Sequence, residues 1–175
     1  MDRKISLKYG QIAGGSVVLY FLLFYLLDKE IMLKIWVAAS SMLIYLFFMA
    51  KAVSDQRKLQ EGIISFREAI SVAFLTLIIA NVIYYIFYFF IIKSDSELVV
   101  ILNQNYIDYY QKIFSGQNPA EIEKSFEGFE VNLSFVLLRF AQGAIIGFLL
   151  SLIIAGTMRR GKRLTKVGSR KSENY

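Results

Sequence analysis

The chain contains no cysteine, no histidine and a single proline, Pro119. The absence of cysteine and histidine excludes disulfide bonds, thiolate nucleophiles, histidine-ligated metals and acid–base catalysis by histidine. The remaining residues form no recognisable nucleophile–base pair or metal-binding motif. We therefore expect a protein that is not an enzyme and that uses no cofactor.

Charged residues are missing from four long stretches. These are Tyr9–Leu27, Ile35–Ala50, Ala69–Ile92 and Phe140–Met158, with 19, 16, 24 and 19 residues. A helix of 19 residues spans roughly 28 Å, which is close to the ~30 Å hydrocarbon core of a bilayer. Hydrophobic residues make up 56% of the chain, more than a soluble domain of 175 residues tolerates. We predict an all-α fold, a polytopic membrane protein with one domain of four transmembrane helices at about 9–27, 33–50, 67–92 and 133–158.

Lysine and arginine are unequally distributed between the two ends of these predicted helices. Apart from Arg139, 14 of them lie in the N-terminal segment, the loop after the second helix and the tail, and five lie on the opposite side. Because basic loops are retained in the cytoplasm, both termini should be cytoplasmic in a multi-pass protein of the bacterial inner membrane. The net charge of +6 then reflects this topology, and we expect no nucleic-acid partner.

The segment 94–130, between the third and fourth predicted helices, is amphipathic. Its apolar residues recur at helical spacing and predict a helix over about Asp95–Phe114. They are Leu98, Leu102, Tyr106, Tyr109, Tyr110 and Ile113. Asn118, Pro119 and Glu121 then predict a second helix start, since they match an N-cap, a first-turn proline and a capping box. The segment is either a lid on the bundle or at the headgroup level, or a docking surface for another envelope protein.

Small residues form stripes on two of the predicted helices. Four-residue steps connect Gly143, Gly147, Ser151 and Ala155 on the fourth helix and Gly10 and Gly14 on the first. Small residues allow transmembrane helices to approach closely. Since Gly14 and Ser151 lie at comparable depths, we predict that the first and fourth helices cross there. The alternative is that a stripe contacts another subunit.

Two polar residues lie within the predicted spans. Asn81 is near the middle of the third helix, where an unpaired amide is costly, so we expect it to hydrogen-bond to a neighbouring helix. Arg139 lies about two turns inside the fourth helix, and we expect its guanidinium to reach lipid phosphates. An ion pair with Asp28 or Glu30 is the alternative.

Aromatic residues gather at the predicted outer boundary, notably Tyr84, Tyr85, Tyr88 and Phe90 of the third helix. An interfacial belt explains most of them, and a groove for a polyisoprenoid or acyl chain is the alternative. At the other boundary, the tail 159–175 is strongly basic, and cations next to a membrane attract anionic headgroups at about 1 kcal/mol each. We expect headgroup contacts from Arg139, Arg159, Arg160, Lys162, Arg163 and Lys166. The expected partners are thus membrane lipids, including anionic ones, and an integral membrane protein or further copies of the chain.

Four segments carry a family resemblance: Lys8–Gly14, Gly62–Ala69, Asn118–Glu121 with Glu123, and Ile153–Ala155 before the basic end. Through them the chain resembles a bacterial four-helix membrane family catalogued as domain of unknown function 4199. The resemblance implies four spans in the inner membrane and supplies no catalytic residues. Members of that family are often encoded beside membrane-associated glycosyltransferases, which suggests a class of partner.

Two functions are compatible with these features. The preferred one is a non-enzymatic inner-membrane subunit that scaffolds or regulates an envelope membrane assembly, such as a lipid-linked glycosyltransferase. The alternative is a small membrane carrier or channel for an apolar or lipid substrate. A continuous cavity through the bundle would favour the carrier, and a filled core would favour the subunit.

Overall fold

The computed structural model of the chain describes residues 3–114, 116 and 118–158. Within this range the fold is all-helical, as predicted, with seven helices and no β-strand. Four helices are long and apolar enough to cross a membrane: α1 (Arg3–Leu27), α3 (Ile35–Leu59), α4 (Phe66–Ser94) and α7 (Leu133–Met158). The prediction of four transmembrane helices is therefore confirmed.

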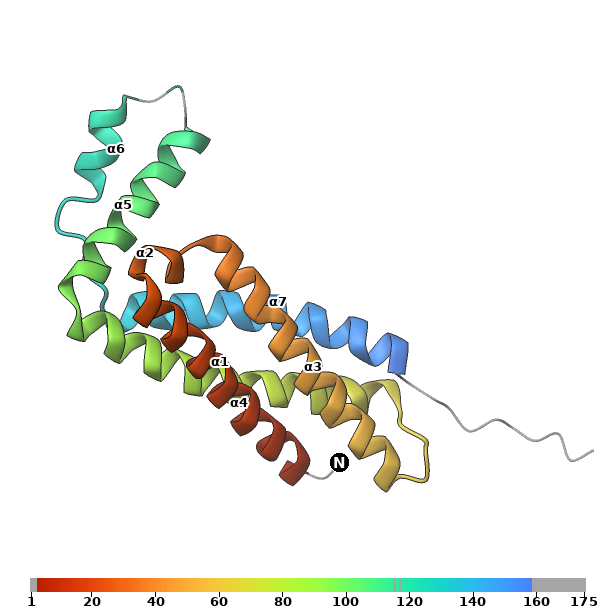
Figure 1. The fold of residues 1–175 in the computed structure, drawn as a ribbon. Helices are drawn as coiled ribbons and strands as arrows, with labels where there is room; N and C mark the ends of the chain where they lie inside the picture. Colours follow the sequence, from red (N-terminus) through yellow and green to blue (C-terminus); the bar gives the residue numbers. More distant parts are fainter. Residues whose placement is uncertain (1–2, 115, 117, 159–175) are drawn as a thin grey trace, which may run out of the picture.

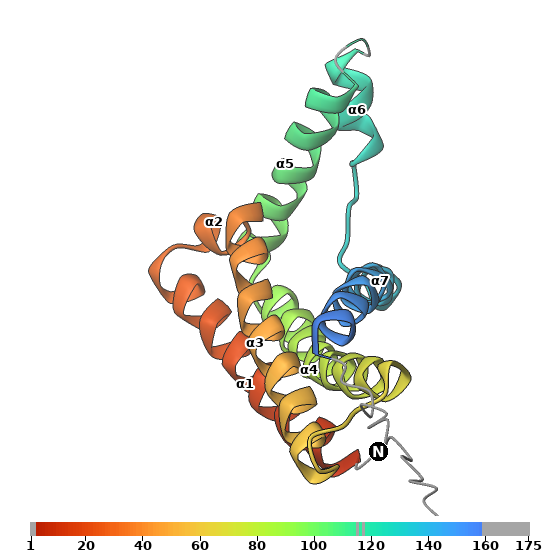
Figure 2. The same ribbon diagram turned by 90° about the vertical axis from the view of Figure 1, so that its right-hand side faces the viewer.

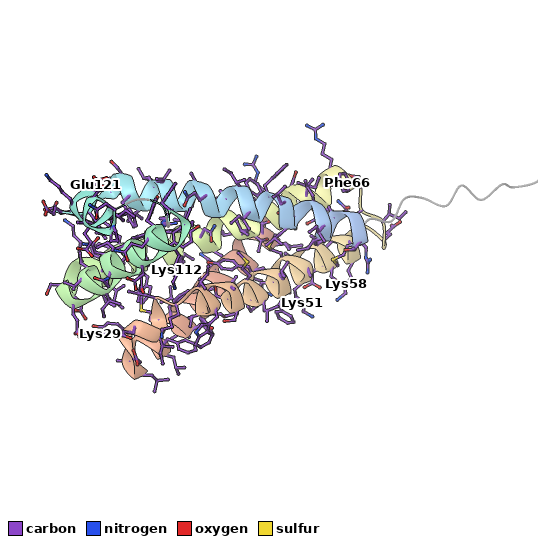
Figure 3. All side chains as sticks on the ribbon, turned by 90° about the horizontal axis from the view of Figure 1, so that it is seen from above. Lys29, Lys51, Lys58, Phe66, Lys112 and Glu121 are labelled. Atoms are coloured by element: carbon purple, nitrogen blue, oxygen red, sulfur yellow. The ribbon has the colours of Figure 1, made fainter. Side chains whose placement is uncertain are left out.

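The helices lie close to the predicted spans, except where charged residues continue a helix into water. α1 begins at Arg3, and α3 continues past Lys51 and Lys58 to Leu59 (Figure 3). α3 ends just before Glu61 and Gly62, whose φ angles of 53° and 85° do not occur within a right-handed helix. The charge-free stretches therefore give the apolar part of each helix, whereas backbone conformation determines where the helix ends.

α4 is the central helix and packs against α1, α3 and α7 (Figures 1 and 2). α1 and α7 lie on different sides of α4 and do not contact each other. The predicted crossing at Gly14 and Ser151 is therefore wrong. Both small-residue stripes pack on α4 instead, because a Cβ at Gly14 would lie 2.9 Å from the Ile83 Cβ, and one at Gly143 would lie 3.3 Å from the Tyr85 hydroxyl. Small residues permit close approach without specifying which neighbour approaches.

The two ends of the bundle differ in what they carry. At one end, which we call the terminus end, α1 begins and α7 ends (Figure 1). At the opposite hairpin end, the short α2 (Lys29–Met32) connects α1 to α3, and α5 (Ser96–Ile113) and α6 (Pro119–Ser125) form a helical hairpin. This hairpin runs crosswise to α4 and α7 and extends past the side of the bundle (Figures 1 and 2).

The half of the bundle next to the terminus end has a filled core. Its fully buried members from α3 and α4 are Met49, Ala52, Val53, Ala69, Val72 and Ala73. The Ser6 hydroxyl donates to the Val72 carbonyl over 3.2 Å, and the Tyr9 hydroxyl donates to Asp55. These hydrogen bonds join α1 to α4 and to α3, so this half is closed by both packing and polar contacts.

Both helices predicted in the outer segment are present, and the predicted N-cap of the second one is confirmed. The Asp95 side chain accepts a hydrogen bond from the Glu97 N–H at the start of α5. The Asn118 side chain accepts one from the Ala120 N–H at the start of α6, and Pro119 occupies the first turn. The local capping residues were therefore sufficient to locate the start of α6, whereas the spacing of the apolar residues located α5.

The apolar face predicted for α5 is buried only near the bundle. Leu98 and Leu102 are 0% and 7% exposed, and they pack in a second apolar core with Ile92, Val131 and Val136. Tyr109 and Ile113 are 56% and 53% exposed, because this part of the hairpin extends past the bundle. The hairpin is thus anchored at its base and does not close over the bundle (Figure 1).

Candidate functional site

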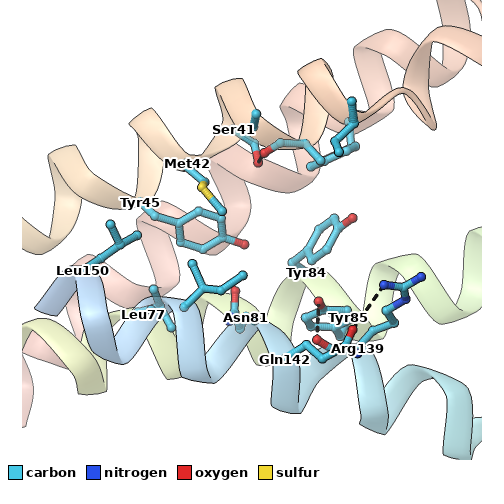
Figure 4. Close-up of a pocket in the computed structure, with 17 residues that line it drawn as sticks. Ser41, Met42, Tyr45, Leu77, Asn81, Tyr84, Tyr85, Arg139, Gln142 and Leu150 are labelled. Carbon is cyan, nitrogen blue, oxygen red and sulfur yellow. Dashed lines mark hydrogen bonds between the residues drawn. The ribbon is translucent and has the colours of Figure 1, made fainter. Parts of the chain in front are cut away.

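A groove of about 450 Å³ opens at the side of the bundle, between α3 and α7 and against α4. It lies in the half next to the hairpin end, and its volume is in the ~300–1,000 Å³ range of small-molecule sites. We call it the lateral groove (Figure 4), and its lining includes Ala38, Ala39, Met42, Tyr45, Leu77, Asn81, Tyr84, Tyr85, Arg139, Gln142, Gly143, Gly147 and Leu150.

Small side chains on facing helices create the lateral groove. α3 and α7 both pack on α4 but contact each other only lightly. Ala38 and Ala39 of α3 and Gly143 and Gly147 of α7 line the space between them and are too small to fill it. Leu77 of α4 packs directly on Gly147, where a Cβ would lie 2.4 Å from the Leu77 Cδ1. The groove is therefore floored by α4.

Asn81 places an amide inside the lateral groove. Its side chain is 6% exposed and has no hydrogen bond to any described residue. The Asn103 Oδ1 is the one fully enclosed side-chain polar atom without a partner in the described part of the chain, so the Asn81 amide is reached from the groove. The predicted hydrogen bond to a neighbouring helix is not found, because the α7 residue facing Asn81 is Gly143, which has no side chain to offer.

Three tyrosines lie around Asn81 (Figure 4). The Tyr85 hydroxyl donates to the Arg139 carbonyl over 2.9 Å and so ties α4 to α7. The hydroxyls of Tyr45 and Tyr84 have no hydrogen bond to another residue that the structure describes. The groove therefore combines a mostly apolar lining with several hydrogen-bonding groups that lack a protein partner.

Arg139 lies at the rim of the lateral groove. Its Cζ is 4.9 Å from the centroid of the Tyr106 ring and 5.5 Å from that of Phe135. Its Nη1 donates to the Gln142 Oε1 over 3.2 Å. The aromatic contacts hold the guanidinium by cation–π attraction. Among residues 3–114, 116 and 118–158, no carboxylate forms an ion pair with it.

The alternative for Arg139, an ion pair with Asp28 or Glu30, is therefore not found among the described residues. Asp28 instead caps α2, since its carboxylate accepts hydrogen bonds from the N–H groups of Glu30 and Ile31 at 2.7 and 3.1 Å. The Arg139 guanidinium lies instead against the rings of Tyr106 and Phe135. Its contact with lipid phosphates stays a prediction.

A charged cluster holds the hairpin base to the bundle. The Lys29 Nζ lies 2.7 Å from the Asp95 Oδ2 and 2.5 Å from the Glu97 Oε2. The Tyr25 hydroxyl donates to Asp95 over 2.9 Å. The hydrogen bond between Lys29 and Asp95 lowers the pKa of Asp95 and raises the pKa of Lys29. At neutral pH this cluster is an ion pair that joins α1, α2 and the α4–α5 junction.

The remaining predicted packing residues are buried inside the chain. Ser151 and Ala155 are both 0% exposed, and the Ser151 hydroxyl donates to the Gly147 carbonyl of its own helix over 2.7 Å. A Cβ at Gly10 would lie 2.7 Å from the Ile79 Cβ of α4. The predicted headgroup residues of the tail, Arg159, Arg160, Lys162, Arg163 and Lys166, lie outside the described residues.

Sequence reasoning missed the residues that α3 contributes to the groove, among them Ala38 and Ala39, and it missed Gln142 of α7. Small residues on both α3 and α7 are a detectable pattern, but the pattern has meaning only once α3 is known to face α7. No group of three or more acidic residues that could hold a metal ion occurs within the described ranges. The lining of the groove itself presents one cation, two amides and several hydroxyls as hydrogen-bonding groups.

Residues 8–160 match the family model described as protein of unknown function, DUF4199. The chain belongs to this family. The match includes the whole of α3, α4 and α7, which form the lateral groove, and the hairpin. No curated protein and no solved structure matches the chain. Because the family description assigns no activity, the function has to be inferred from the geometry.

Proposed function

We propose that the chain is a non-enzymatic subunit of the bacterial inner membrane that scaffolds or regulates an envelope assembly, such as a lipid-linked glycosyltransferase. The hairpin of α5 and α6 is the docking element for an integral membrane partner. Both termini face the cytoplasm and the hairpin faces the opposite side, as the distribution of basic residues favours. The single observation that carries the proposal is this projecting, partly apolar hairpin.

The tip of the hairpin exposes large apolar side chains. Tyr109, Ile113 and Phe114 are 56%, 53% and 44% exposed. Aromatic residues dominate the energetics of protein interfaces because they bury much area with few rotatable bonds. The tip therefore offers the anchor residues that a partner protein would bury.

The charge of the hairpin favours a protein over a lipid surface as its partner. From α5 to Glu130 the sequence has six acidic residues and two lysines. Glu121, Glu123 and Glu127 are exposed, and none of them forms an ion pair with a described residue. Anionic headgroups would repel this surface, whereas a basic protein surface would attract it.

The shape of the interior supports a subunit over a channel. The lateral groove is floored by Leu77 and occupies one half of the bundle. In the other half, Met49, Val53 and Val72 are fully buried in a packed core. A carrier would need a rearrangement of that core, while a docking subunit needs none.

A photo-crosslinking amino acid at Ile113 tests the proposal in intact cells. It should form an adduct with one integral membrane protein, identified by mass spectrometry. The adduct should be lost in a Glu121→Gln, Glu127→Gln double variant, which removes two negative charges and keeps the size of both side chains. Two controls are used. In the first, the crosslinker is placed at Leu149, an exposed residue of α7 within the membrane span. In the second, Glu61→Gln removes an exposed acid at the terminus end.

The interpretation depends on which crosslinker position gives the adduct and on which charge variant removes it. An adduct obtained at Ile113 but not at Leu149, insensitive to Glu61→Gln, supports docking on the hairpin. The same set of adducts from both positions, or an adduct that the double variant leaves unchanged, contradicts it.

A further inference from the structure

We propose that the lateral groove binds one glycerophospholipid. The phosphate lies on Arg139, an ester carbonyl lies on Asn81, and one acyl chain follows α7 toward Leu150. This site is separate from the hairpin tip and does not depend on the docking role proposed above.

The surroundings of Arg139 suit a phosphate ligand. The rings of Tyr106 and Phe135 fix the guanidinium at the rim, and its one side-chain hydrogen bond within the described structure goes to Gln142. A guanidinium has five N–H donors in a planar arrangement that matches phosphate oxygens. Since no described carboxylate neutralises it, an anionic oxygen ligand supplies the missing partner.

Asn81, which lies deeper in the groove than Arg139, indicates a second polar group of the ligand. Its Nδ2 lies 3.4 Å from the position of a Cβ at Gly143, and Gly143 is one helical turn, about 6 Å, below Arg139 on α7. A nine-tenths-buried amide without a hydrogen bond requires a polar partner in the groove. In a glycerophospholipid the ester carbonyls lie a few bonds from the phosphate, so one molecule can reach both Arg139 and the amide one helical turn below it.

The lower part of the groove fits an acyl chain. Below Asn81 it is lined by Leu77, Ile146 and Leu150, which present only hydrocarbon. From Arg139 to Leu150 the α7 axis covers about 16 Å, roughly half of the ~30 Å hydrocarbon core. The groove thus has the depth of one leaflet, and it opens sideways between two membrane helices, where acyl chains are the surrounding solvent.

The test measures lipid retention by native mass spectrometry. The full chain is purified in a neutral detergent, stripped of lipid, and titrated with diacyl phosphatidylglycerol, with its ether-linked analogue, or with a polyprenyl phosphate. Arg139→Gln should weaken retention of all three about tenfold, the effect of losing one charge-assisted hydrogen bond. Asn81→Leu should weaken retention of the diacyl lipid several-fold and leave the ether lipid unchanged, because only the former has ester carbonyls.

Three controls separate the site from general effects. Lys124→Gln removes an exposed hairpin cation and should change nothing. Ala38→Trp should fill the groove and abolish retention, whereas Ala141→Trp, on an exposed α7 residue outside the groove, should not. Each variant is accepted after its helix content and melting temperature match those of the parent chain.

Equal loss with Lys124→Gln, or full retention in Ala38→Trp, would overturn the site. Tighter binding of the polyprenyl phosphate with no effect of Asn81→Leu would overturn the assignment to a glycerophospholipid. Retention lost in Arg139→Gln and Ala38→Trp, with the ester-specific effect of Asn81→Leu, establishes it.

Discussion

Individual glycines set the distance between the membrane helices. At Gly10 a Cβ would lie 2.7 Å from the Ile79 Cβ and 2.9 Å from the Thr76 carbonyl oxygen. A backbone atom cannot move aside as a side-chain end can, so this contact is rigid. At Gly15, five residues along the same helix, no atom lies within 4 Å of an added Cβ. The two positions therefore differ in packing while sharing helix and membrane environment.

Gly10→Ala should destabilise the bundle by about 1–3 kcal/mol, because α1 must separate from α4 to admit the methyl group. Gly15→Ala should be neutral or stabilising by up to about 1 kcal/mol, since alanine is the better helix former. Thermal unfolding in the same mild detergent compares the two. Equal melting temperatures would show that α1 does not pack on α4 at Gly10.

At the scale of elements, the hairpin is the part whose position depends on polar contacts. α5 was predictable from the helical spacing of its apolar residues, and α6 was predictable because its cap, Asn118, acts on a backbone group two residues away. The short α2 was not predicted, since its formation depends on a side-chain cap at Asp28 within a connection too brief to show periodicity. The exposed tip could not be foreseen either, because exposure depends on the direction in which the hairpin leaves the bundle.

The Lys29–Asp95 pair should anchor α5 across the neutral pH range. The lowered pKa of Asp95 means that its contribution is present above its ordinary value of 3.8 and is lost as the pH falls through the lowered value. The raised pKa of Lys29 means that its contribution is present below 10.5 and is lost as the pH rises through the raised value. Between these limits the anchor should not vary with pH.

Asp95→Asn should therefore increase amide exchange in the first turns of α5 at neutral pH and remove the acid-dependent part of that exchange. The asparagine can still cap the helix, so the change reports the lost ion pair. Hydrogen–deuterium exchange read by mass spectrometry provides the measurement. Asp108→Asn is the control, because Asp108 accepts a hydrogen bond from Gln104 of its own helix. Identical exchange in both variants would assign no anchoring role to the Lys29–Asp95 pair.

At the scale of the whole molecule, the number of membrane helices followed directly from the charge-free stretches. The sequence did not show which helices are neighbours, because small residues such as Gly14 and Ser151 suit any close helix. The structure places α4 between the helices that carry these two residues. The lateral groove could not be predicted from the sequence either. Asn81 and Arg139 were recognised as unusual, but the groove that they line exists only because small residues of α3 and α7, such as Ala38 and Gly143, leave space between these two helices.

The central claim is that the hairpin and the two termini lie on opposite sides of the membrane, with the hairpin outside. The chain has no cysteine, so a single introduced cysteine reports its own position. Leu59, at the end of α3, is 66% exposed, and Ser125, at the end of α6, is also exposed. Both substitutions leave the topology-determining charges unchanged.

Labelling of intact cells with a membrane-impermeant maleimide tests this claim most directly. The Ser125→Cys variant should react in intact cells, and the Leu59→Cys variant should react only after the membrane is permeabilised. Reaction of Leu59→Cys in intact cells with protection of Ser125→Cys would contradict the orientation, and with it the docking role of the hairpin.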